Sequence, residues 1–267
     1  MPHGYPQVVP AAPLVDTHIH FRDLHERDPD FPERFAASGI QACAASHARE
    51  EFLWTEGLRS KGLEFSTSLG IHPQSPSMNH ANFISEAVRQ GRVDFIGEAG
   101  FDFFGDCPER VRSPENEAIQ REAFEFQLEL ALANGLPLLI HVRKALDLIF
   151  AYSRRLARLQ AAVFHSWPGT PDEAEALIRQ GIPAYFSFGS IVMNGHKRAM
   201  ASLAVLPADR ILSETDAPWQ PPRGSHFCRF EDLGRIVDSL AAVRDVGPEK
   251  LREDILATWV SIQGGAG

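Results

Sequence analysis

The chain has 267 residues, of which 44% are hydrophobic and 23% are charged, and its formal net charge is -9 at pH 7. These proportions are those of a globular protein, which excludes disordered and fibrous classes. No window approaches the roughly 20 uninterrupted apolar residues that a membrane span needs, so we expect no membrane partner. The N-terminal stretch MPHGYPQVVPAAP lacks the basic start and long apolar run of a secretion signal, so we expect a cytoplasmic protein.

The charged residues and the cysteines also limit the class of partner. Only four of the 26 basic residues are Lys, and they form no basic tail or stripe, so we expect no tight binding to duplex DNA. An acidic chain can still take a nucleic-acid end into a metal-lined pocket, because the ions supply positive charge locally. Cys43, Cys107 and Cys228 form no Cys-x-x-Cys pair, so the sequence predicts neither a disulfide framework nor a thiolate metal site.

Short apolar runs bounded by turn residues alternate with amphipathic stretches along the chain. We predict eight strands, at residues 13–17, 39–46, 63–70, 93–100, 136–142, 161–166, 182–189 and 210–216. The clearest helices between and after them span residues 116–133, 144–159, 171–180, 229–244 and 248–259.

This order of elements predicts the fold class. Strand, helix and strand repeated along the chain call for parallel strands with right-handed crossovers. Eight such units in a chain of this length favour a TIM (β/α)8 barrel, which is an α/β fold. We expect an extra helix at the C-terminus to pack outside the barrel. A doubly wound open sheet is the alternative. Because no linker or shift in composition is evident, we expect residues 1–267 to form a single domain.

Two histidines follow the first predicted strand, in the sequence LVDTHIH. On an extended backbone, side chains two residues apart point to the same face, so His18 and His20 aim their imidazoles into one small volume. A lone His-x-His pair is equally typical of surface histidines in a loop. A metal site therefore requires further ligands downstream.

Candidate ligands follow other predicted strands in the same way. Glu98 lies in IGEAG, His141 in LLIHVR, His165 in VFHS and Asp216 in SETD. In a parallel barrel the carboxyl ends of the strands share one rim, where reactive residues gather. Each residue alone is also explained as a hydrogen-bonded core histidine or a capping carboxylate. Together they would place several unpaired ionisable groups in one barrel mouth, which is costly.

Four imidazoles and two carboxylates form a nitrogen and oxygen site that suits divalent ions such as Zn, Mn or Mg rather than thiolate-preferring metals. Six ligands are too many for one structural ion. We therefore predict two divalent metal ions, about 3.5 to 4 Å apart, that lower the pKa of a shared water. The predicted bridge is Glu98. The two predicted shells are His18, His20 and Asp216 for one ion, and His141 with His165 for the other.

The ordered motifs resemble those of the TatD-type metal-dependent deoxyribonucleases, a family of amidohydrolase-like barrels. The resemblance runs over nearly the whole chain, through VDTHIH, LGIHP, IGEAGFDFF, FHSWPG and LSETDAPWQPPRG. It implies the same assignment of the metal ligands. It also implies substrate contacts from His72 and Arg143, and Arg223 is a third candidate, since a guanidinium suits a phosphate oxygen. The alternatives are a loop histidine before proline for His72, a helix-surface arginine for Arg143 and a solvated loop arginine for Arg223.

Several segments depart from the pattern of that family. The sixth strand usually continues as His-Cys-Phe-Ser-Gly, whereas this chain has HSWPG, and Gln74 stands where histidine is common. The usual Asn-Glu-Pro is missing from RGSHFCRF, and the usual ending is replaced by TWVSIQGGAG. The resemblance therefore supports the fold and the metal ligands more firmly than it supports nuclease specificity.

The resemblance implies an enzyme, a hydrolase that cleaves ester bonds with a metal-activated water, Asp216 and Glu98 being the catalytic residues. Its expected substrate is a single-stranded nucleic-acid end or another small phosphodiester, cleaved in exonuclease fashion. A small-molecule amidohydrolase or lactonase is the alternative, since it could use the same ligands on a carbonyl centre. Trp167, Trp219 and Phe103 could stack on a base or wall an apolar substrate. A non-catalytic metal-binding barrel is the third hypothesis.

Overall fold

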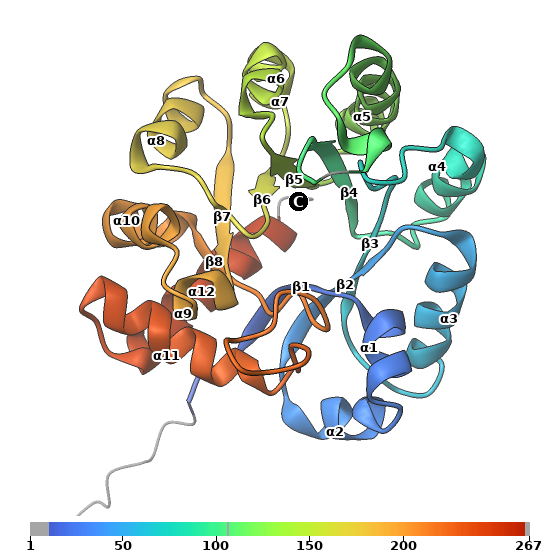
Figure 1. The fold of residues 1–267 in the computed structure, drawn as a ribbon. Helices are drawn as coiled ribbons and strands as arrows, with labels where there is room; N and C mark the ends of the chain where they lie inside the picture. Colours follow the sequence, from blue (N-terminus) through green and yellow to red (C-terminus); the bar gives the residue numbers. More distant parts are fainter. Residues whose placement is uncertain (1–10, 106, 265–267) are drawn as a thin grey trace, which may run out of the picture.

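A computed structural model describes residues 11–105 and 107–264, and it has the predicted barrel architecture (Figure 1). All eight strands are parallel and pair in chain order. The strands are β1 (Val15–Ile19), β2 (Gln41–Ser46), β3 (Ser66–Leu69), β4 (Phe95–Asp102), β5 (Leu138–Arg143), β6 (Ala162–Phe164), β7 (Ala184–Phe188) and β8 (Ile211–Ser213). The prediction of a TIM barrel is confirmed, and the open doubly wound sheet is wrong.

Hydrogen bonds between β8 and β1 close the barrel. The Ser213 hydroxyl donates to the carbonyl oxygen of Val15 at 2.6 Å, and the Thr17 hydroxyl donates to the carbonyl oxygen of Ser213 at 3.0 Å. Just beyond β8, the backbone N–H of Asp216 donates to the carbonyl oxygen of His18 at 2.9 Å. The first and last strands therefore meet directly beneath the candidate site.

The helices form a ring around the strands (Figure 1). They are α1 (Phe21–Arg27), α2 (Phe31–Ser38), α3 (Arg49–Arg59), α4 (Ala81–Arg89), α5 (Pro114–Asn134), α6 (Leu146–Ala151), α7 (Ser153–Leu156), α8 (Pro171–Arg179), α9 (Ser190–Met193), α10 (Lys197–Val205), α11 (Asp232–Arg244) and α12 (Pro248–Gln263). Short 3-10 turns lie at Met78–His80 (η1), Pro108–Arg110 (η2) and Ala208–Arg210 (η3). Within the described ranges, no helix is long and apolar enough to cross a membrane.

The predicted helices are present, with one difference. The helix expected over residues 144–159 is two short helices, α6 and α7, which meet at Tyr152. Both predicted C-terminal helices form, and α12 packs against the amino-terminal end of the barrel. There the ring of Trp259 stacks on Phe95 with centroids 5.1 Å apart and planes 5° apart. The extra C-terminal helix therefore covers the end of the barrel that faces away from the predicted rim.

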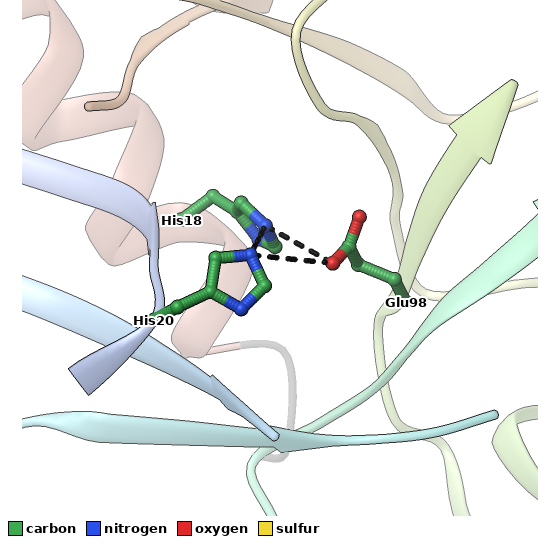
Figure 2. Close-up of side chains that lie close together, drawn as sticks. All are labelled: His18, His20 and Glu98. Carbon is green, nitrogen blue, oxygen red and sulfur yellow. Dashed lines mark hydrogen bonds and ion pairs between the residues drawn. The ribbon is translucent and has the colours of Figure 1, made fainter. Parts of the chain in front are cut away.

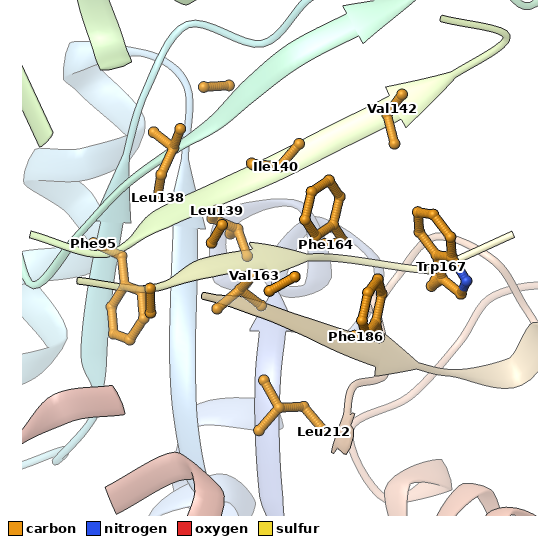
Figure 3. Close-up of a cluster of buried hydrophobic side chains, with 14 of the residues drawn as sticks. Phe95, Leu138, Leu139, Ile140, Val142, Val163, Phe164, Trp167, Phe186 and Leu212 are labelled. Carbon is orange, nitrogen blue, oxygen red and sulfur yellow. The ribbon is translucent and has the colours of Figure 1, made fainter. Parts of the chain in front are cut away.

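The core lies between the strands and the helices (Figure 3). Phe164 of β6 stacks on Phe186 of β7 with centroids 5.6 Å apart, and Trp167 packs edge-on to Phe186 at 4.9 Å. Burying a large apolar side chain of this kind contributes about 1.5–3 kcal/mol relative to leaving it exposed. The indole N–H of Trp167 donates to the hydroxyl of Ser202 in α10 at 3.3 Å. Trp167 of the HSWPG segment is therefore a core residue.

Candidate active site

A pocket of about 700 Å³ opens at the carboxyl ends of the strands. Five of the six predicted ligands line it, and they are His20, Glu98, His141, His165 and Asp216. The sixth, His18, lies beneath them with 0% of its surface exposed. The structure therefore brings all six predicted ligands together at one rim.

His18, His20 and Glu98 form one half of the cluster (Figure 2). The Nε2 atoms of the two histidines are 3.0 Å apart and lie 3.2 and 3.6 Å from Oε2 of Glu98. Oδ1 of Asp216 lies 3.5 Å from Nε2 of His18 and 3.2 Å from Nε2 of His20. Two nitrogens and two carboxylate oxygens thus converge on one small volume.

The other half of the cluster gathers around the second oxygen of Glu98. Nε2 of His165 and Nδ1 of His141 are 2.9 Å apart and lie 2.8 and 3.3 Å from Oε1 of Glu98. Nε2 of His72 lies 3.6 Å from the same oxygen. The two oxygens of one carboxylate therefore face two separate sets of imidazoles.

This arrangement fits divalent cations. Two nitrogens bound tetrahedrally to one Zn²⁺ at about 2.0–2.1 Å lie roughly 3.3 Å apart, and the facing nitrogens here are 3.0 Å and 2.9 Å apart. Facing imidazole nitrogens must either share a proton or point their lone pairs at a common cation. Burial alone would raise the pKa of Glu98, but the charges of His18 and His165 hold that pKa well below its usual range. Glu98 is therefore a carboxylate at neutral pH, as a bridging ligand must be.

Two glycines of β4 allow Glu98 to reach this position. Gly97 and Gly100 have φ values of +137° and +153°. A Cβ atom would lie 2.4 Å from the carbonyl oxygen of Leu139 at Gly97, and 1.8 Å from that of His141 at Gly100. Only glycine fits so close to β5. The sequence IGEAG thus brings the backbone of β4 against the strand that carries His141.

The buried carboxyl group of Asp16 joins the first strand, β1, to the segment after the last strand, β8, below the cluster. Asp16 accepts hydrogen bonds from the backbone N–H and the hydroxyl of Thr215, at 2.9 and 2.6 Å. It also accepts one from the backbone N–H of His18 at 3.3 Å. Burial raises the pKa of Asp16 to about 7. These bonds hold the segments that carry His18 and Asp216 in register.

Four polar residues that were not predicted from the sequence contact the cluster. Nε2 of His47 lies 2.9 Å from Oε2 of Glu98, and Oδ2 of Asp102 lies 2.9 Å from Nε2 of His141. The amide of Gln220 donates to Oδ2 of Asp216 at 2.6 Å. Oε1 of the buried Glu214 lies 3.6 Å from Nδ1 of His165.

A usable signal was present for more than one of these four residues. Glu214 directly follows β8. His47 directly follows β2, so the strand-end rule that selected the other ligands applies to it as well.

The three predicted substrate contacts have different positions. His72 lines the pocket and joins the cluster, where burial lowers its pKa well below the usual range. Arg143 lies at the pocket edge, with its guanidinium carbon 4.1 Å from the ring centroid of Phe104. Arg223 is outside the pocket lining, and its backbone N–H donates to Oδ1 of Asn194 at 2.8 Å. The structure therefore brings His72 and Arg143 to the site, but not Arg223.

The fold and this cluster define a TIM barrel with a candidate metal centre of the hydrolase type at the carboxyl ends of its strands. A model of the family described as TatD related DNase matches residues 15–261. The chain therefore belongs to the TatD-related DNase family, which confirms the resemblance found in the sequence.

Individual relatives agree with this assignment. The chain is 33% identical over 190 residues to the 3'-5' ssDNA/RNA exonuclease TatD of Edwardsiella piscicida, which covers 68% of this chain and 65% of that protein. It is also 34% identical to the 3'-5' ssDNA/RNA exonuclease TatD of a Pantoea species, over 60% of each chain. The chain thus covers less than two thirds of the length of either exonuclease. The chain is 27% identical to an uncharacterized metal-dependent hydrolase, YjjV of Escherichia coli (strain K12). That match covers 91% of this chain and 95% of YjjV.

Solved structures support the fold. The crystal structure of E. coli YjjV superposes with a TM-score of 0.81 at 24% identity, covering 93% of this chain and 97% of the other. A TatD family hydrolase of Entamoeba histolytica superposes with a TM-score of 0.76 at 14% identity, covering 94% and 98%. The predicted architecture is thus shared with members of the family.

Proposed function

We propose that the protein is a metal-dependent phosphodiesterase that removes nucleotides from the end of a single-stranded nucleic acid. The observation that carries the proposal is the division of the imidazoles between the two oxygens of Glu98, which suits a pair of bridged divalent ions. The exonuclease names of the Edwardsiella and Pantoea relatives support this choice of substrate.

Each half of the cluster would hold one ion. His18, His20 and Asp216 would bind the first, His141 and His165 the second, and Glu98 both. When bound, such ions polarise a phosphoryl oxygen and lower the pKa of a water. Nitrogen and carboxylate ligands without thiolates suit Zn, Mn or Mg.

Asp216 is the proposed general base. Its Oδ1 faces His18 and His20, and its Oδ2 accepts a hydrogen bond from Gln220. Burial would raise the pKa of Asp216, but the hydrogen bond with His20 and the charge of His18 lower it, so the group is a carboxylate at neutral pH. Asp216 can therefore orient an attacking water and accept its proton.

Two pocket residues that do not follow β8, Arg143 and His72, are suited to hold the substrate. Arg143 presents its guanidinium at the pocket edge, where it can donate to a non-bridging phosphate oxygen. His72, with its lowered pKa, is a neutral imidazole close to Glu98. Its Nδ1 accepts a hydrogen bond from the backbone N–H of Gln74 at 3.1 Å, so Nε2 carries the proton and can donate one hydrogen bond.

The test compares the metal-loaded protein on a 5′-labelled single-stranded oligonucleotide and on a panel of lactones and amides. We expect shortening of the oligonucleotide and no turnover of the panel. Asp216→Asn should lower kcat by about 10²- to 10⁴-fold with little change in KM, whereas Asp209→Asn, on the surface in η3, should have no effect. Normal turnover by Asp216→Asn with its metals bound would exclude the role of Asp216.

The other outcomes decide between the hypotheses. Turnover of lactones or amides alone would favour the small-molecule amidohydrolase. A metal-loaded sample that is inactive on every ester, amide and phosphodiester would favour a non-catalytic barrel.

A further inference from the structure

The pocket has two unlike walls on opposite sides of its metal cluster. The strands run in order around the barrel, so β4 and β5 lie across the mouth from β8 and β1. Arg110 and Arg143 line the pocket on the side of β4 and β5, and Trp219 lines it on the side of β8. One wall is cationic and the other aromatic, with Glu98 between them.

Arg110 is held at the cationic wall by its neighbours. Its Nη2 donates to Oε1 of Gln74 at 2.9 Å, and the amide nitrogen of Gln74 donates to Oδ2 of Asp102 at 2.7 Å. The side chain also packs against Gly105, where an added Cβ would lie 3.2 Å from Cδ of Arg110. The bond to Gln74 uses only one of the several N–H donors of the guanidinium. Among the described side chains, Gln74 is the one that hydrogen-bonds to this guanidinium, so its other N–H groups can donate to an anion in the pocket.

Gln74 connects Arg110 to Asp102. Its amide presents an acceptor to Arg110 and a donor to Asp102 at the same time. Arg110 is thereby connected through two hydrogen bonds to the carboxylate that contacts His141. Gln74 therefore belongs to the cationic wall.

Trp219 is fixed in place although it is 46% exposed. Its indole N–H donates to Oδ2 of Asp23 at 3.1 Å, and its backbone N–H donates to the carbonyl oxygen of Asp216 at 2.7 Å. Trp167 and Phe103, the other two aromatic candidates, are buried. An exposed indole held at the rim of a pocket is suited to stack on a planar ligand.

We infer that the aromatic wall binds the base of the terminal nucleotide and that the cationic wall binds the phosphate on the other side of the scissile linkage. Trp219 stacks on the base, Arg110 pairs with the next phosphate, and the scissile phosphodiester lies at the cluster between them. This inference rests on the proposed function and adds to it the way in which the strand end is oriented. A neutral lactone or amide has neither a stacking base nor a second phosphate, so it would use neither wall.

The test pairs protein variants with altered substrates. Three single-stranded oligonucleotides are compared: one unmodified, one with an abasic terminal nucleotide, and one with a neutral methylphosphonate at the linkage next to the scissile one. The variants are Trp219→Ala, Trp219→Phe and Arg110→Gln. Arg179→Gln, on the outer helix α8, is the control. Circular dichroism and thermal melting establish that each variant is folded.

Each variant should respond to one substrate change only. Trp219→Ala should raise KM about 5- to 150-fold on the unmodified strand, which is the usual range for losing a base stack, and leave KM on the abasic strand nearly unchanged. Trp219→Phe should retain most of the affinity. Arg110→Gln should raise KM on the unmodified strand about tenfold, as loss of one charged hydrogen bond does, and leave KM on the methylphosphonate strand unchanged. The kcat values should change little, because both contacts are made before and during the reaction.

The outcomes separate the inference from the proposed function. If the wild type cleaves the unmodified strand but Trp219→Ala loses equal affinity for the unmodified and abasic strands, the stacking role is wrong and the proposed function stands. If Arg110→Gln raises KM equally for the unmodified and the methylphosphonate strands, the role of Arg110 is wrong and the proposed function stands. If the metal-loaded wild type cleaves no oligonucleotide, the proposed function fails and the inference fails with it.

Discussion

Oδ2 of Asp102 lies 2.9 Å from Nε2 of His141, and the other ring nitrogen of that histidine faces Glu98. Burial would raise the pKa of Asp102, but the hydrogen bonds with His141 and Gln74 lower it. A carboxylate at this position holds the imidazole proton on Nε2 and leaves the lone pair of Nδ1 directed into the cluster. Pairs of this kind orient metal-binding histidines and increase their basicity.

Asp102→Asn should therefore weaken metal binding. The amide can place an N–H group opposite Nε2, which favours the tautomer that cannot donate the Nδ1 lone pair. We expect the affinity for the second ion to fall by about 10- to 100-fold, measured by calorimetric titration of metal into the stripped protein. Asp209→Asn should bind as the wild type does. Unchanged affinity in a folded Asp102→Asn protein would show that Asp102 does not orient His141.

Gly100→Ala should destabilise the barrel as well as the site. An added Cβ would meet the carbonyl oxygen of His141 at 1.8 Å, and neither backbone can move without separating β4 from β5. We expect a loss of about 3 kcal/mol in the free energy of unfolding, measured by urea denaturation.

Gly57→Ala is the matched control for this substitution. Gly57 lies inside α3, and no atom lies within 4 Å of the place that an added Cβ would take. Alanine there should stabilise the protein by about 0.5–1 kcal/mol, because it favours the helix. A Gly100→Ala protein as stable as the wild type would contradict the close approach of the two strands.

The period of the strands explains why most of the site was predictable. His18 and His20 share a face because they are two residues apart in an extended segment, as expected. The same rule applies along β4, where Glu98 and Asp102 are four residues apart and both side chains reach His141. Asp102 was missed because the predicted strand ended at Gly100. In the structure, β4 continues to Asp102.

Other features depend on contacts that no local pattern encodes. Gln220 reaches Asp216 from a loop in which both residues have positive φ values, of 48° and 55°. A side-chain contact made by such a loop follows from its tertiary packing rather than from periodicity. The helix expected over residues 144–159 is broken at Tyr152, whose hydroxyl donates to Oε1 of Glu125 in α5 at 2.6 Å.

The cysteines should differ sharply in reactivity. Cys107 is exposed, whereas Cys43 and Cys228 are buried, and burial raises the pKa of both buried thiols. Because the thiolate is the reactive form, we expect one fast-reacting thiol with a disulfide reagent at pH 8 and all three after unfolding in guanidinium. Cys107→Ser should abolish the fast phase. A second fast thiol in the folded protein would contradict the burial of Cys43 or Cys228.

The same pKa shifts give a direction for stability at high pH. A thiol ionises near pH 8.5 in an unfolded chain, about its ordinary pKa, but Cys43 and Cys228 stay protonated in the folded state to a higher pH. The contribution of these two thiols to the free energy of unfolding is therefore complete below about pH 8.5 and declines as the pH rises above that value. Replacing Cys43 with alanine should make the decline in the free energy of unfolding between pH 8 and 10 less steep. An unchanged slope would show that the thiol does not ionise on unfolding in this range.

Removal of metal should lower the thermal stability of the protein. Four buried or nearly buried histidines face two carboxylates in the cluster, and ions bound there would bind the folded state only. One ion at about 100 times its dissociation constant stabilises a folded protein by roughly 2.7 kcal/mol, and two such ions stabilise it by about 5.4 kcal/mol. For a chain of this size the loss of one ion corresponds to a fall in Tm of about 5–10 °C and the loss of both to about 10–20 °C, measured by calorimetry before and after chelation and after adding Zn²⁺ or Mn²⁺ back. His18→Ala should lose most of this shift and His226→Ala, at an exposed position, should keep it. An equal Tm with and without chelator in a sample shown to have contained metal would mean that the cluster does not couple ion binding to folding.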